Sequence, residues 1–247
     1  KKTRVSSDQI ISFFRFMRLF DVSLFSINGT LKKAASDPDG NMIDQDWMQS
    51  DRQLDVYSES SISEFDAFVL DINLEWVYMQ QGAWSLFSGF GYLRQEFEYE
   101  GQLIGQSSPS GVYPEYTYQG DGSTGITYET TYSMVYFLLG ADMQVTPQLN
   151  LSGKFSVAPL ATADDELVHL YRNKVSSGDM DGSAYIFELT GNYHILPLWF
   201  VEVGAQFTTI SADGDQQQIL DGQALGRVDE ETVSDQASLY ITMGYSF

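Results

Sequence analysis

The chain has 247 residues with no cysteine, and its 34 acidic against 13 basic side chains give a formal net charge of −21. A hydrophobic fraction of 43% argues against a disordered chain, and the missing cysteines exclude disulfides and thiolate metal sites. So strong a negative charge argues against a nucleic-acid partner and favours cationic peptides or divalent cations.

Apolar and polar residues alternate through most of the chain, which is typical of β-strands with two different faces. The alternation predicts about nine strands, at residues 9–20, 22–33, 54–79, 84–104, 125–145, 149–170, 183–195, 198–211 and 233–247. Tight turns are expected near residues 20–21, 80–83, 146–148 and 196–197. Long polar loops are expected at about 33–53, 105–124, 171–182 and 212–232.

The polar positions of these strands include charged residues, namely Asp71, Glu75, Lys154, Glu188 and Glu202. This pattern fits a soluble sandwich with a buried apolar face, or a transmembrane barrel with its apolar face on lipid. Aromatic residues gather near strand ends, as in the interfacial girdles of membrane proteins: Trp76, Tyr78, Trp84, Tyr193, Trp199 and Tyr245. Together with the alternation of short and long connections, they favour the barrel.

We therefore predict one domain over residues 1–247, an antiparallel transmembrane β-barrel with periplasmic turns and extracellular loops. Several strands exceed the roughly 10 residues that cross a bilayer, so the loops should stand above the outer leaflet. Bacterial barrels of one chain have even strand numbers, so ten strands are expected and the first is predicted to precede Lys1. An unusual closure, or a partner that covers the open edge, is the alternative.

The predicted loop at 33–53 contains the sequence GNMIDQDWM at residues 40–48. In extended backbone, Asp44 and Asp46 would project from the same face. Carboxylates so close together shift each other's pKa, which suits the activation of a water molecule. An isolated pair of this kind is more typical of a solvated acidic loop.

Residues 40–48 resemble the catalytic loop of the omptins, outer-membrane endopeptidases of Gram-negative bacteria. Weaker similarities follow in the same order, at residues 53–54, 64–66, 91–92, 154–156, 165–166 and 171–175. The resemblance extends from about residue 10 to the end of the chain. It implies a ten-stranded barrel, in agreement with the strand count.

The resemblance also implies a catalytic group divided between two sides of the barrel mouth. One side is an Asp pair, here Asp44 and Asp46, and the other is an Asp–His pair that activates a water. Asp165 fits the second Asp, but Leu167 stands where the His is expected and His169 follows two residues later. At about 3.3 Å per residue, His169 would lie roughly 7 Å further along the strand. A β-bulge near Leu167 would bring it back.

Two further expectations follow from the resemblance. Omptins cut next to basic residues, but one acid of that pocket falls at Ala163, so a cationic preference depends on the overall charge. Omptins also need lipopolysaccharide, but Glu96 stands where a lipid-binding Arg is expected, with Arg94 nearby. Lipopolysaccharide is thus a possible activator, and no metal or other cofactor is expected because calcium-loop spacing is absent.

We therefore predict an omptin-like aspartyl-type endopeptidase in the outer membrane, with catalytic residues Asp44, Asp46, Asp165 and His169 and with peptide or protein substrates. The alternative is a catalytically degenerate barrel that serves as a structural or interaction protein, with a partner at its loops. A hydrogen bond from His169 to Asp165, with a water-sized gap to Asp44, would favour the protease.

Overall fold

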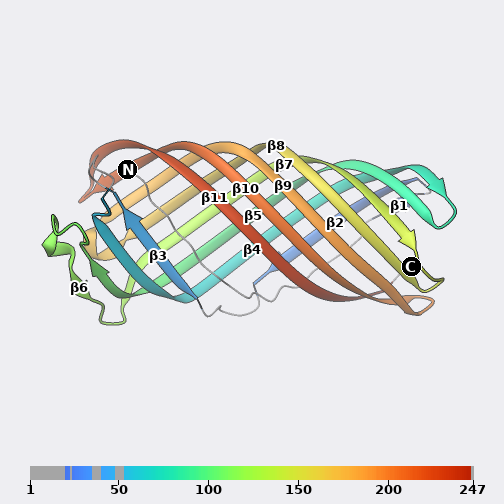
Figure 1. Ribbon diagram of the computed structural model, residues 1–247, viewed down its shortest axis with the longest axis horizontal. Coiled ribbons are helices and arrows are strands. Elements are labelled where there is room, and N and C mark those ends of the chain that lie inside the picture. Colours follow the sequence, from blue (N-terminus) through green and yellow to red (C-terminus); the bar gives the residue numbers. More distant parts are fainter. Residues whose placement is uncertain (1–19, 23, 35–39, 48–52, 246–247) are drawn as a thin grey trace.

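A computed structural model shows one sheet curled about a long axis, with its strands oblique to that axis (Figure 1). The structure describes residues 20–22, 24–34, 40–47 and 53–245, and of residues 20–22, 46 and 245 the backbone alone. The predicted strand at 9–20 therefore lies outside the described residues, apart from Phe20. None of the described segments forms a helix long and apolar enough to cross a membrane.

The described chain forms eleven strands and two single-turn 3₁₀ helices. They are β1 (Phe20–Val22), β2 (Phe25–Lys33), β3 (Asn41–Asp46), β4 (Val56–Gln81), β5 (Trp84–Ser107), η1 (Pro114–Tyr116), β6 (Tyr118–Gln119), β7 (Thr124–Gln144), β8 (Leu149–His169), η2 (Leu170–Arg172), β9 (Lys174–Leu196), β10 (Trp199–Leu220) and β11 (Gln223–Tyr245). Neighbours pair in the order β1-β2-β4-β5-β7-β8-β9-β10-β11, while β3 adds to β4 and β6 to β5. Every pair is antiparallel, which confirms the predicted fold class.

The loops predicted at residues 171–182 and 212–232 are largely strand. β9 begins at Lys174, and β10 and β11 are joined by the two-residue turn Asp221–Gly222, where both residues have positive φ. Both faces of these strand segments are polar, so the sequence shows no alternation of apolar and polar residues there. Gln216 and Gln218 of β10 are buried in the lumen, and Gln218 donates a hydrogen bond to Gln216 over 2.7 Å.

Strand β3 continues the edge of β4 that β2 has already begun. β2 pairs with residues 68–76 of β4, and β3 pairs with residues 56–61. The predicted loop around Asp44 thus contains a strand. We call the end of the sheet that carries β3, β6 and η1 the mouth; it lies at the left in Figure 1.

The outer surface changes character along the strands. Near the turns, large apolar side chains face outward, and register links Leu139, Phe155, Phe187 and Phe207 into one row whose members are 45–61% exposed. An outward apolar band of this kind is typical of membrane barrels. Nearer the mouth, the outward positions are acidic, and register places Asp164, Asp179, Asp215 and Asp229 side by side.

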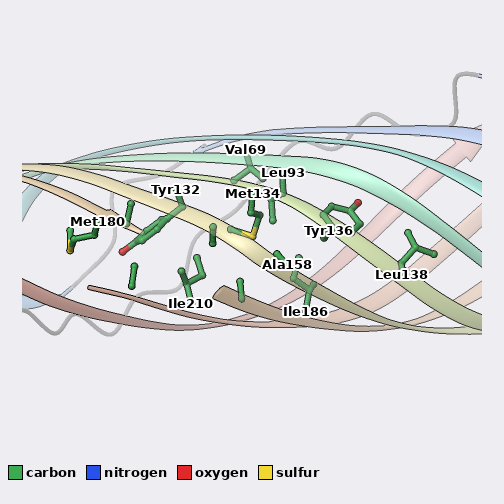
Figure 2. Packing of buried hydrophobic residues seen from close by; sticks show 14 of the residues in the cluster. Val69, Leu93, Tyr132, Met134, Tyr136, Leu138, Ala158, Met180, Ile186 and Ile210 are labelled. Atoms are coloured by element: carbon green, nitrogen blue, oxygen red, sulfur yellow. The ribbon is translucent and has the colours of Figure 1, made fainter. Parts of the chain in front are cut away.

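The lumen is filled rather than open. Apolar side chains, among them Tyr132, Met134, Met180 and Ile210, converge in its middle (Figure 2). On the side away from the mouth the lumen is polar, and Lys154 forms an ion pair of 2.7 Å with Glu75. These apolar side chains separate the polar end of the lumen from the mouth.

The two ends of the described sheet approach each other across the lumen. Lys32 of β2 donates a hydrogen bond of 3.0 Å to Gln206 of β10, and its ammonium lies 5.8 Å from the ring of Tyr240 on β11. No backbone ladder joins β1 to β11 among the residues that the structure describes. Side chains in the lumen therefore hold the curvature of the sheet there.

Candidate active site

Asp44 and His169 meet at the mouth. Asp44 lies on β3 opposite Ser58 of β4, and His169 is the last residue of β8, opposite Ile126 of β7. Both side chains point inward, and they are only 3% and 5% exposed. His169 Nε2 lies 3.5 Å from Asp44 Oδ2. The structure thus brings together one predicted residue from each side of the lumen.

Arg172 joins this pair. It ends η2, and Asn173 follows in the left-handed conformation, which folds the chain back into β9. Arg172 Nη2 lies 2.7 Å from Nδ1 and 3.0 Å from Nε2 of His169, and 3.6 Å from Asp44 Oδ2. The guanidinium carbon also lies 5.8 Å from the centre of the Tyr116 ring. A buried acid, a buried base and a buried cation therefore share one place.

Sequence reasoning did not assign Arg172 to the site. It treated residues 171–174 as a loop, because the three-residue η2 turn and the start of β9 carry no alternation. The available signal was the spacing: three residues after His169, a single helical turn returns the side chain to the same side.

Asp165 lies further down the lumen. Its Oδ2 accepts a hydrogen bond from the Tyr128 hydroxyl and its Oδ1 accepts one from the Gly178 amide, both of 3.0 Å. The ladder between β7 and β8 is regular from Asp165 to His169, and its irregularity lies at residues 158–161 instead of near Leu167. At about 3.3 Å per residue, Asp165 is roughly 13 Å from His169 along the strand.

A second carboxylate faces Asp165. A Cβ placed on Gly178 would lie 2.5 Å from Asp165 Oδ1 and 2.2 Å from Glu230 Oε2, so both carboxylates converge over this glycine. Burial raises the pKa of Asp165, against the lowering effect of its bonds to Tyr128 and Gly178. The lumen below the mouth therefore carries concentrated acidic groups. The backbone of Asp46 pairs with Val56 in β3, and its side chain lies outside the described residues.

A small recess adjoins His169. Its walls include Ser58, Ser60, Gln106, Tyr118 and Arg172, and its volume of about 10 Å³ is that of a single water site. Burial raises the pKa of Tyr118, although the charge of Arg172 lowers it, so the hydroxyl stays protonated. The recess thus places neutral hydroxyl and amide groups beside the base.

The connection from β5 to β7 covers the site. The Gln106 side chain donates to the Tyr116 carbonyl over 2.9 Å, and the rings of Tyr118 and Tyr171 meet edge to face at 6.1 Å. The Tyr171 hydroxyl also contacts the Ser123 hydroxyl and donates to Asp121 over 3.1 Å. Gln106, Tyr118 and Tyr171 also line the recess with His169, so these contacts hold the segment beside that residue.

Metal chemistry has no evident ligands here. Within residues 20–22, 24–34, 40–47 and 53–245, no group of three or more His, Cys, Asp or Glu side chains could hold a metal ion. The arrangement instead offers an imidazole, a carboxylate and a guanidinium, which are the groups of acid–base and electrostatic catalysis.

The fold and the site together define a membrane-type β-barrel sheet that carries an Asp–His pair at its mouth. The chain belongs to the omptin family, whose model matches residues 17–247. Among solved structures, it is similar to the outer membrane protease OmpT from Escherichia coli, with 18% identity, 90% of this chain and 77% of that chain covered, and a TM-score of 0.65. No curated protein sequence matches the chain. The predicted family is thereby confirmed, and the chain is a member of an outer-membrane protease family.

Proposed function

We propose that the chain is an endopeptidase in which the Asp44–His169 pair activates a water molecule for attack on a peptide bond. The observation that carries this proposal is the buried contact of 3.5 Å between His169 Nε2 and Asp44 Oδ2. A carboxylate that accepts the proton of one ring nitrogen fixes the tautomer and leaves the other nitrogen as a base. With Nε2–H directed at Asp44, the base is Nδ1, and the water-sized recess adjoins this ring.

Asp46 and Asp165 complete the proposed group. Asp46 is two residues after Asp44 on β3, and we propose it as the second acid of the Asp pair. Asp165 lies below the pair, and with Glu230 it forms an acidic floor. In this proposal the carboxylates of the floor bind a cationic side chain of the substrate, while Asp44 and His169 activate the water.

The substrates are proposed to be cationic peptides or proteins. The net charge of −21 and the acidic outer wall near the mouth would concentrate them there. The protein would lie in the outer membrane of a Gram-negative bacterium with its mouth outside the cell, since the apolar belt surrounds the other end. Lipopolysaccharide would be its lipid environment, but the outward Arg94 is already paired with Glu96 at 2.6 Å.

A second candidate is a barrel of this family that has lost catalysis and acts through its loops, with a protein partner. Two observations favour it. Asp165 gives its hydrogen-bonding capacity to Tyr128 and Gly178, and the Asp44–His169 pair is covered by Arg172 and by the segment around Tyr116.

Cleavage of a peptide library separates the two candidates. The barrel is purified in lipopolysaccharide micelles and given peptides that contain basic residues, and products are read by mass spectrometry. We expect Asp44→Asn to lower the rate by about 10²–10⁴-fold, as loss of acid–base machinery does. Asp164→Asn, on the exposed outer wall, removes the same charge as a control. Absence of cleavage by wild type, or equal cleavage by Asp44→Asn, would support the second candidate.

A further inference from the structure

We propose that Arg172 is a catalytic residue, whose guanidinium binds the oxyanion that forms when water attacks the peptide carbonyl. This inference rests on the proposed function. Its basis is the position of Nη2, which contacts both nitrogens of the base and approaches the carboxylate of Asp44. A donor at that point lies beside the base and borders the recess in which the water is proposed to bind.

The guanidinium of Arg172 is held in place as a hydrogen-bond donor. Arg172 is largely buried, and the ring of Tyr116 lies against its guanidinium at 5.8 Å, which restrains the plane of the fork. The recess beside His169 is lined by Arg172 as well, so the guanidinium borders the place where the water is proposed to bind. Buried donors aimed at developing charge contribute strongly to catalysis, because no solvent must reorganise.

The acids around the base make such a cation necessary. An oxyanion that forms beside Asp44 would be repelled by the carboxylate of that residue. Arg172 supplies the opposite charge at the same place. Lys174, which stands opposite His169 in the β8–β9 register, is another buried cation at this height and provides a comparison.

The proposed step moves one proton and one electron pair. The water oxygen forms a bond to the carbonyl carbon while the π pair of the carbonyl moves onto its oxygen, and His169 Nδ1 takes the water proton. In the structure, Nη2 lies 2.7 Å from Nδ1. When the carbonyl oxygen takes this donor, Nδ1 becomes available as the base. Collapse of the oxyanion then breaks the C–N bond, the histidine returns its proton to the leaving nitrogen, and Arg172 keeps its own protons throughout.

The test compares two inhibitors on the same variants. A phosphinate peptide carries a tetrahedral oxyanion, whereas the matching reduced-amide peptide carries none. For Arg172→Met we expect kcat to fall by about 10²–10³-fold with little change in KM, and phosphinate affinity to fall in proportion while reduced-amide affinity is kept. Arg172→Lys should recover part of both. Arg227→Met is the control, because that side chain is 73% exposed on β11.

Binding of the phosphinate also separates this inference from the proposed function. If wild type cleaves nothing but binds the phosphinate through Arg172, the anion site stands and the endopeptidase does not. Equal loss of both inhibitors in Arg172→Met would overturn the inference, because the residue would then be structural. A rise in the activity of Arg172→Met would also overturn it, because Arg172 would then block the site. A phosphinate affinity that depends on Lys174 instead of Arg172 would overturn it as well.

Discussion

His169 Nε2 lies 3.5 Å from Asp44 Oδ2, although β4, β5 and β7 separate their strands in the pairing order of the sheet. The contact therefore crosses the lumen and exists only because the sheet curls. Neither residue could make it from an isolated hairpin. The candidate site is for this reason a product of the curled sheet, and its two halves can be tested for joint action.

We expect Asp44→Asn and His169→Gln to be non-additive in kcat/KM. Each single change should cost about 10²–10⁴-fold, and the double variant should cost no more than the worse single one, because groups that act as a unit fail together. Steady-state cleavage of one basic peptide by the four proteins measures this. Multiplication of the two single losses in the double variant would show that the residues act separately.

The sequence predicted the strand order, the inward parity of Asp71 and Glu75, and the proximity of Asp44 to a histidine. The strand order and the inward parity depend on alternation, which is local, whereas the meeting of Asp44 with a histidine was implied by the resemblance to the omptins. It did not predict the partners of Asp165, because Tyr128 and Gly178 come from neighbouring strands whose register is set by the whole sheet. Strand ends near the mouth were missed for another reason: outside the apolar belt, both faces of a strand are polar and resemble a loop.

Asp165 should make stability depend on pH. Burial raises its folded pKa above the ordinary value of 3.8, so between these two pKa values the folded state binds more protons than the unfolded state. The contribution of Asp165 to stability should therefore be fully present below pH 3.8 and be lost as pH rises through the raised folded pKa.

Thermal unfolding in detergent, followed from acid to neutral pH, measures this effect. Asp165→Asn should lose this component of the pH dependence, and its stability relative to wild type should increase as pH rises. The neighbouring Asp164→Asn, exposed on the outer wall, should keep it. Parallel curves for wild type and Asp165→Asn would contradict the prediction.

Removal of one partner of the ion pair between Lys154 and Glu75 should lower the free energy of unfolding more than removal of both partners. It spans 2.7 Å inside the lumen, so Lys154→Met leaves a buried carboxylate and should cost about 3–5 kcal/mol of unfolding free energy. The double variant Lys154→Met with Glu75→Gln should recover most of that loss. Denaturant unfolding in micelles measures both. Breaking the exposed Arg227–Asp215 pair should cost at most about 1 kcal/mol, and a similar loss at Lys154 would place that pair in water.

The apolar belt makes a prediction about insertion. Phe187 faces outward on β9 within the row that includes Phe155 and Phe207. An arginine there must enter hydrocarbon, so Phe187→Arg should destabilise the inserted barrel by about 2–4 kcal/mol near the bilayer midplane. Ser177 lies on the same strand with the same outward parity, nearer the mouth and beside Glu166. Ser177→Arg should therefore insert like wild type. Folding into phospholipid vesicles, scored by heat-modifiable migration in gels, compares the two, and equal insertion would mean that the belt does not contact lipid.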